Sequence, residues 1–155
     1  MPIETLEPIL GTHPFLKGLG HTHLQLLIGC ATNVRFAAGE RICREGEEAN
    51  HFYILREGLV AIEIPAGHRH GITIETIGAG DVLGWSWFVA PYRWRFDARV
   101  IEPTRAIALD AKCLRGKCER DHELGFELLN RVLQVVEQRL QATRMQLLDV
   151  YGGPE

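Results

Sequence analysis

Short stretches of alternating apolar and polar residues fill the middle of the chain, and glycines separate them about every ten residues. Val60, Ile62 and Ile64 form one such stretch, Pro65–Gly71 reads as a hairpin tip, and Ile72–Ile77 reads as the return strand. Because successive side chains of a strand point to opposite faces, each stretch can bury one face and expose the other. The pattern favours an antiparallel β structure that is closed or folded into two layers.

A further strand pair is predicted at the end of this region. Ala98–Glu102 and Arg105–Leu109 have the composition of strands, and Pro103–Thr104 between them has the composition of a turn. With this pair the roll would contain about eight strands in all. The predicted fold class is therefore mainly β, a β-roll or jelly roll, with short helices before it and a long helix after it.

The regions before and after the strands are helical in character. Pro14 can occupy a first helical turn, and Gly18 and Gly20 divide the N-terminal region into two short helices. Near the other end, Asp121 is a suitable N-cap and Glu123 falls in the first turn of a long helix. The 155 residues suit one domain with three parts: a helical lead-in over 1–31, the roll over 32–110 and C-terminal helices over 111–150.

Composition narrows the classes of function. The formal net charge is -3, whereas a nucleic-acid-binding face is basic, so DNA binding by this chain alone is not expected. No apolar run reaches the roughly 18 residues of a membrane-spanning helix, and the first residues lack the pattern of a signal peptide. We therefore expect a cytoplasmic protein without membrane partners. Its four cysteines are expected to be reduced thiols: Cys30, Cys43, Cys113 and Cys118.

Glycine-containing motifs in the strand region carry a resemblance to a known family. The motifs are Phe36-Ala-Ala-Gly39-Glu-Arg-Ile42, Glu45-Gly46, Phe52-Tyr53-Ile54-Leu55-x-x-Gly58 and Ile77-Gly-x-Gly80-Asp81-Val82-Leu83-Gly84. With them, residues 34–110 resemble the cyclic-nucleotide-binding domain of the catabolite-activator family of bacterial transcription regulators. The resemblance implies a β-roll, a regulatory function in signal transduction, and a C-terminal helix that forms a dimer.

The resemblance also implies a ligand site just after Gly84, where the family binds a cyclic phosphate at the start of a short helix. In the family a Glu follows that glycine and holds the ribose hydroxyl, and an Arg further on pairs with the phosphate. Here Trp85 follows Gly84, Phe96 takes the Arg position, and Asp97 takes the position of a small residue. Losing one partner of a buried charged pair costs roughly 2–5 kcal/mol, or about 1.5 to 3.5 decades in affinity. We therefore predict that cyclic AMP and cyclic GMP do not bind in the family's usual way.

The segment after Gly84 is nevertheless the candidate ligand pocket. Its candidate residues are Gly84, Trp85, Ser86, Trp87, Arg93, Arg95, Phe96 and Asp97. The aromatic rings could hold a different, nucleotide-like ligand with Arg93 or Arg95 turned toward it, or they could plug the pocket. The sequence leaves open which arginine faces the pocket and which ligand binds. A plugged pocket would make the chain a dimeric scaffold that acts through a partner protein.

A metal site is a further alternative. His68, His70 and Glu75 are spaced as in the metal motif of cupins, another double-stranded β fold, and could converge on a metal. Both histidines fall on the predicted hairpin tip, where side chains face solvent, so we predict no metal ligands and no cofactor. No nucleophile motif or phosphate-binding loop is present, and we predict that the protein is not an enzyme.

The C-terminal helix carries an apolar heptad repeat. Its seam consists of Phe126, Leu129, Leu133, Val136, Leu140, Thr143 and Leu147. Leu128, Val132 and Val135 lie off this seam and are expected to pack on the roll, whereas the narrow seam suits a partner helix. A parallel homodimer is predicted, although the whole helix could also fold back on its own domain. Little chain follows the helix, so we expect a stand-alone sensor or regulatory domain.

Overall fold

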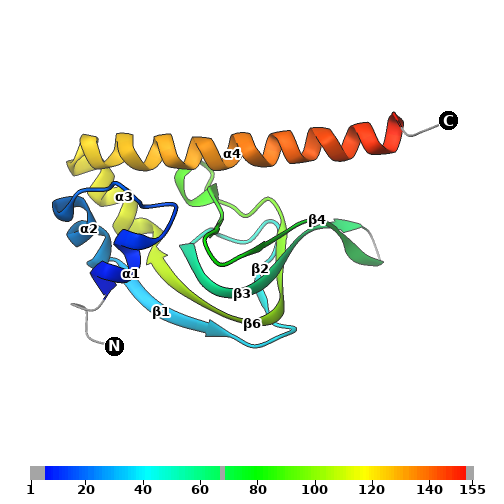
Figure 1. Ribbon diagram of the computed structural model, residues 1–155, viewed down its shortest axis with the longest axis horizontal. Helices are drawn as coiled ribbons and strands as arrows, with labels where there is room; N and C mark the ends of the chain where they lie inside the picture. Colours follow the sequence, from blue (N-terminus) through cyan, green and yellow to red (C-terminus); the bar gives the residue numbers. More distant parts are fainter. Residues whose placement is uncertain (1–5, 67–68, 153–155) are drawn as a thin grey trace.

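A computed structural model describes residues 6–66 and 69–152. Its strands are β1 (Ala31–Phe36), β2 (Arg41–Cys43), β3 (His51–Ala66), β4 (Arg69–Gly78), β5 (Val82–Leu83) and β6 (Asp97–Asp110). Its helices are α1 (Leu6–Thr12), α2 (His21–Ile28), α3 (Ala111–Arg120), α4 (His122–Tyr151) and the short 3-10 helix η2 (Ser86–Phe88). The long helix α4 extends across the rolled sheet, and α1, α2 and α3 gather at one end of the molecule (Figure 1).

The strands form one antiparallel sheet with β6 and β3 at its centre. The strand order is β1-β6-β3-β4, with β2 paired to β6 and β5 paired to β3. Apolar residues of the two central strands are fully buried, among them Phe52, Ile54, Ile107 and Leu109. The mainly β roll between short N-terminal helices and a long C-terminal helix, predicted from the sequence, is confirmed.

The prediction of about eight strands is wrong, because the described residues form six. The expected pair Ala98–Glu102 and Arg105–Leu109 is a single strand, β6, and β3 likewise continues through Gly58. Gly58 has φ +109 and lies against Pro103–Thr104, so that a Cβ on it would come within 2.6 Å of the Thr104 Cα. The predicted turn is thus a bulge within one ladder, where Pro103 has no N–H to donate.

The break between α1 and α2 falls at residues 13–20, where glycines predicted it, but Pro14 lies in this break and not in a helical turn. That prediction is wrong because His13 fixes a turn here. The His13 Nδ1 accepts the N–H of Phe15 at 3.1 Å, so its Nε2 carries the proton and donates to the Leu55 carbonyl at 3.0 Å. Burial lowers the pKa of His13 below its ordinary 6.5, which favours the neutral ring that this geometry needs.

A disulfide joins Cys30, just before β1, to Cys113 in α3, and the prediction of four reduced thiols is therefore wrong. The two Cα atoms are 5.9 Å apart, a separation that suits a disulfide, although the cysteines are 83 positions apart in sequence. No spacing motif marks such a pair in advance. Cys43 and Cys118 are free and buried, and burial raises the pKa of Cys118 to about 11.

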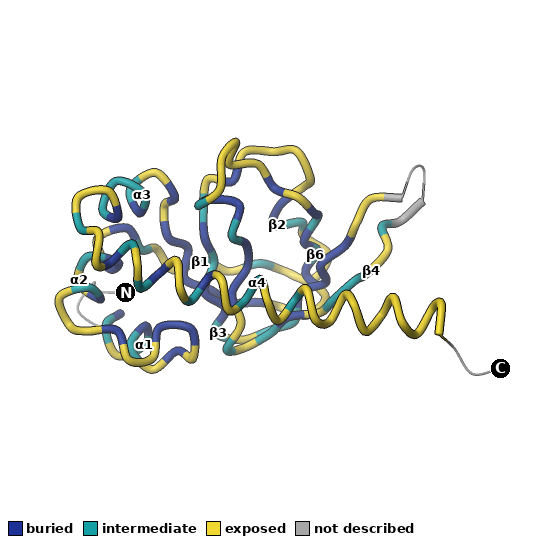
Figure 2. The backbone as a smooth tube through the Cα atoms, turned by 90° about the horizontal axis from the view of Figure 1, so that it is seen from above, coloured by how far each residue is buried: buried dark blue, intermediate teal, exposed yellow. Residues whose placement is uncertain are grey.

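Helix α4 buries apolar side chains in the body of the molecule through its first half, whereas its second half contacts the roll through polar side chains, among them Gln146, whose Nε2 donates to the Ile74 carbonyl at 2.7 Å. The Asp121 side chain accepts the N–H of Leu124 at 3.1 Å, which confirms the predicted N-cap. Leu128 and Val132 are buried and Val135 is half-buried, so this face of the helix is turned toward the body of the molecule. Every described residue of the helix beyond Arg139 is exposed, and Figure 2 shows this half exposed along its length. None of the helices within the described ranges has both the length and the apolar character that crossing a bilayer requires.

Candidate functional site

Aromatic side chains fill the interior behind the segment that follows β5. Gly84 has φ +94, and a Cβ on it would come within 2.7 Å of the Trp94 ring. Trp87 in η2 is fully buried, stacks on Phe88 with ring centroids 4.4 Å apart, and lies 5.2 Å from the Phe52 ring. Only glycine fits at this turn, because both the positive φ and the adjacent indole exclude a side chain.

The two positions where the resembled family carries its Glu and Arg are occupied by rings that meet each other. Trp85 is half-buried, and its ring contacts Phe96 edge-on with the centroids 6.1 Å apart. Phe96 is buried and also lies 5.8 Å from the Trp94 ring. The wall at this point is therefore apolar, with no carboxylate from position 85 and no guanidinium from position 96.

The two candidate arginines face different sides of the segment. Arg95 lines a cavity together with Trp85 and Phe96. Arg93 instead donates from Nη1 to the Gly46 carbonyl at 3.0 Å and lines a separate groove. Of the two arginines, the structure thus places Arg95 at the cavity beside Trp85.

Asp97 turns toward the roll and does not line that cavity. Its carboxylate accepts from Arg41 Nη1 at 3.0 Å and from the backbone N–H of Glu45 at 2.8 Å. The neighbouring Glu63 is buried and pairs with Arg99 at 2.9 Å. The hydrogen bond from Arg99 holds the pKa of the Glu63 carboxyl below its usual range. Asp97 therefore belongs to an ion network of the roll.

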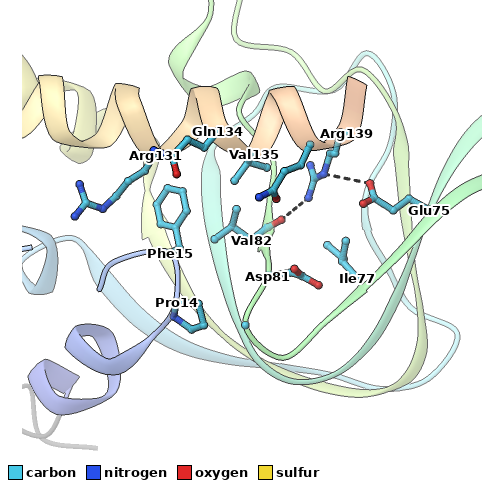
Figure 3. Close-up of a pocket in the computed structure, with 12 residues that line it drawn as sticks. Pro14, Phe15, Glu75, Ile77, Asp81, Val82, Arg131, Gln134, Val135 and Arg139 are labelled. Atoms are coloured by element: carbon cyan, nitrogen blue, oxygen red, sulfur yellow. Dashed lines mark hydrogen bonds and ion pairs between the residues drawn. The ribbon is translucent and has the colours of Figure 1, made fainter. Parts of the chain in front are cut away.

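A cation that the sequence analysis did not single out reaches the site from α4. Arg139 donates from Nη2 to the Val82 carbonyl at 2.7 Å, and its Nε lies 3.2 Å from a Glu75 carboxylate oxygen (Figure 3). Its guanidinium carbon lies 5.1 Å from the centroid of the Trp85 ring. Burial lowers the pKa of Arg139 and raises the pKa of Glu75. Desolvation therefore acts against both charged forms of this pair.

The sequence did contain a signal for Arg139. It lies four residues after Val135 and seven after Val132, so it continues the helical face that packs on the roll. Extending that face by one turn would have placed an arginine against the strands.

Two cavities lie between the roll and α4, and Arg139 lines both. The larger, of about 320 Å³, is lined by Ile62, Ile64, Ile74, Glu75, Trp85, Arg95, Phe96, Val136, Arg139, Leu140, Ala142 and Thr143. The smaller, of about 190 Å³, lies on the side of the N-terminal turn, where Pro14 and Phe15 face Arg131 and Val135 of the helix (Figure 3). We name the larger one the roll–helix cavity.

The segment 84–96 is also tied to α3. Arg115 donates from Nη1 to the Trp87 carbonyl at 2.7 Å, and its guanidinium carbon lies 4.0 Å from the centroid of the Tyr92 ring. Within the described ranges, Ser86 Oγ and Trp87 Nε1 are buried without a hydrogen-bond partner. Contacts from α3 and α4 thus hold the segment on two sides.

The predicted hairpin that carries the alternative metal motif is narrower than Pro65–Gly71, because β3 and β4 pair up to Ala66 and Arg69. His68 lies outside the described residues. Glu75, the carboxylate of the motif, pairs with Arg139. Among the residues that the structure describes, no three His, Cys, Asp or Glu side chains are grouped closely enough to hold a metal ion.

Comparison with known proteins agrees with this architecture. Residues 33–121 match the model of the cyclic nucleotide-binding domain, and the match spans more than half of the chain. The chain therefore belongs to the cyclic nucleotide-binding domain family. No curated protein matches the sequence.

Several solved structures share the fold. A protein from Geobacter metallireducens GS-15, assigned as a cyclic nucleotide-binding protein, is 25% identical with a TM-score of 0.77, over 90% of this chain and 98% of that one. A cyclic nucleotide-binding domain from Methylobacillus flagellatus KT is 19% identical with a TM-score of 0.78, over 94% and 84% of the two chains. The sensor domain of the transcriptional regulator DNR from Pseudomonas aeruginosa is 20% identical with a TM-score of 0.72, over 90% and 93%.

Proposed function

We propose that this protein is a sensor or regulatory domain whose phosphate-binding segment is degenerate and does not hold cyclic AMP or cyclic GMP in the family's way. The observation that carries the proposal is the contact between Trp85 and Phe96, whose ring centroids are 6.1 Å apart. These rings stand where the resembled family has a ribose-binding carboxylate and a phosphate-binding guanidinium. An apolar wall cannot replace the hydrogen bonds that a buried sugar phosphate needs.

The open roll–helix cavity supports sensing over a purely structural role. Trp87 and Trp94 are buried within the core, but Trp85 and Arg95 still line a cavity of about 320 Å³. Ligand-binding pockets have volumes of roughly 300 Å³ and more, so this cavity is large enough for a small ligand. A dimeric scaffold with a plugged pocket is the second candidate, and it is favoured only by the filled interior behind Gly84.

The proposed mechanism couples this cavity to α4. Residues 84–96 are bonded to α3 through Arg115, and Trp85 lies against Arg139 of α4. A ligand that contacts Trp85 and α4 differently in two helix positions would shift the population of those positions. The ligand would thus act on the helix directly.

We further propose that α4 forms a parallel homodimer through its heptad seam. Phe126, Leu129, Leu133, Leu140 and Leu147 are each more than half exposed. Exposed apolar residues at heptad spacing favour a partner helix, because a second helix would bury side chains that face water in the single chain.

Calorimetry with cyclic AMP and cyclic GMP tests the sensor proposal. We expect no saturable heat at up to about 1 mM nucleotide, in line with the loss of two charged contacts. A micromolar dissociation constant for either nucleotide contradicts the proposal. A wider panel of small molecules then separates the candidates, because a sensor shows a ligand-dependent rise in melting temperature and a plugged scaffold shows none.

A further inference from the structure

The positive charge at the roll–helix cavity comes from α4 and from Arg95. Among the residues that the structure describes, three charged side chains line this cavity: Glu75, Arg95 and Arg139. Two guanidinium groups and one carboxylate leave a net charge of one positive unit. Charge complementarity therefore favours a ligand with a single negative charge.

Arg139 has hydrogen-bonding capacity that its present contacts do not use. It donates to the Val82 carbonyl and pairs with Glu75, but its Nη1 is buried and finds no acceptor among residues 6–66 and 69–152. A buried donor without an acceptor is costly, and such groups are rare in folded proteins. A guanidinium presents its N–H groups as a fork that matches the two oxygens of a carboxylate.

The rest of the described cavity wall is apolar except for Thr143, whose hydroxyl donates to the Arg139 carbonyl at 2.8 Å. Ile62 and Ile74 come from the strands, Leu140 and Val136 come from α4, and Trp85 adds an aromatic surface. Such a wall suits a hydrocarbon or aromatic body and disfavours a sugar, whose hydroxyls would lose their hydrogen bonds to water. The cavity of about 320 Å³ limits the body to a small molecule.

We propose that the roll–helix cavity binds a small apolar molecule with one carboxylate group, which is held by Arg139 and Arg95 while the body lies against Trp85 and the aliphatic wall. This inference rests on the proposed sensor function and names its class of ligand. The ligand carboxylate competes with Glu75 for the Arg139 fork. Since Arg139 belongs to α4, binding changes the contact between that helix and β4 directly.

The test measures the binding of 4-phenylbutyrate and of its uncharged amide by calorimetry and by tryptophan fluorescence. We expect the acid to bind and the amide to bind at least about tenfold more weakly, because the charged hydrogen bonds are lost. Equal affinities for acid and amide overturn the proposal. So does the absence of saturable binding of the acid up to about 10 mM.

Matched variants locate the carboxylate. Arg95→Gln should weaken the acid about tenfold and leave the amide unchanged, whereas Arg93→Gln, whose side chain bonds Gly46, should change neither by more than about twofold. Glu75→Gln removes the competing carboxylate and should strengthen binding of the acid. Equal losses in both arginine variants, or weaker binding in Glu75→Gln, contradict the proposal. Circular dichroism of each variant shows whether it is folded.

Failure of this test is distinguishable from failure of the sensor proposal. If a cyclic nucleotide binds at micromolar concentration, the degenerate-segment proposal fails whatever the carboxylates do. If neither class of probe binds, the carboxylate inference fails and the absence of cyclic-nucleotide binding stands.

Discussion

The two halves of α4 have similar apolar content but different surroundings. In the first half, Leu124, Leu128 and Val132 are buried against the body, whereas in the second half Leu148 and Val150 are exposed. The change falls near Arg139, the residue that reaches Val82 and Glu75. Apolar content alone therefore does not decide whether a helix face belongs to the core. What decides it is whether apolar side chains of the body pack against that turn of the helix, because β4 still reaches the second half through the hydrogen bond from Gln146 to the Ile74 carbonyl.

The largest expected effect comes from matched leucine truncations in the two halves. Leu128→Ala should lower the free energy of unfolding by about 2–5 kcal/mol, because it opens a cavity in the core. Leu148→Ala, at a side chain that is 60% exposed, should change it by less than about 0.5 kcal/mol. Urea unfolding monitored by circular dichroism gives both values. Similar losses in the two variants contradict the division of the helix.

Reduction of the Cys30–Cys113 disulfide tests how firmly the first half is anchored through α3. The bond closes a long loop, and its loss should lower the free energy of unfolding by about 2–4 kcal/mol. Thermal unfolding with and without dithiothreitol measures this, and Cys113→Ser serves as the control that the reductant must leave unchanged. Amide hydrogen exchange should quicken in α3 and the first half of α4. If amide hydrogen exchange increases only in the second half of α4, the disulfide does not anchor the first half of the helix.

The next largest effect is expected on dimer formation, from the exposed part of the heptad seam in the second half of α4. Leu147→Ala should weaken the proposed homodimer by roughly 2 kcal/mol, or about thirtyfold in dissociation constant, because both chains lose an apolar side chain. Leu148→Ala lies off the seam and should leave association unchanged. Sedimentation over a range of concentrations measures both. If the wild-type protein stays monomeric throughout the micromolar range, the proposal of a homodimer is refuted.

The smallest expected effect is a pH dependence from the turn beside the first half. Burial lowers the pKa of His13 in the folded state below 6.5, so the unfolded chain binds a proton that the folded chain excludes. Stability is therefore complete above pH 6.5 and falls as the pH drops below it, with a slope of at most about 1.4 kcal/mol per pH unit from this residue. His13→Gln should remove this part of the slope in urea midpoints recorded between neutral and mildly acidic pH. An unchanged slope rules out His13 as its source.

Much of the fold could be predicted because its signals are local. The alternation in β3 and β4, the Asp121 cap and the inward face of Leu128 and Val132 depend on neighbours a few residues away. The bulge at Gly58 and Pro103 depends on pairing between distant strands. Local composition does not contain that pairing, so Pro103–Thr104 was predicted to be a turn. The disulfide escaped prediction for the same reason, since only the fold brings Cys30 to Cys113.

The candidate site was predictable in part. The substitution at Trp85 can be counted from the glycine motif and the one at Phe96 can be counted back from the strand that begins at Asp97, and the structure adds that their rings contact each other. Which of the two arginines, Arg93 or Arg95, lines the cavity depends on how the chain turns between Ser86 and Asp97. Residue spacing does not specify that path. Arg139 is a long-range contribution from another element, visible in the sequence only as a continuation of the buried helical face.

The most direct test of the central claim follows the indole N–H signals of the three tryptophans, Trp85, Trp87 and Trp94, in a ¹H–¹⁵N spectrum. All three rings lie in the segment after Gly84, where the family holds its nucleotide. The account predicts that about 1 mM cyclic AMP leaves the three signals in place, since no charged partner receives the phosphate. A saturable shift of the Trp85 signal by micromolar cyclic AMP contradicts it.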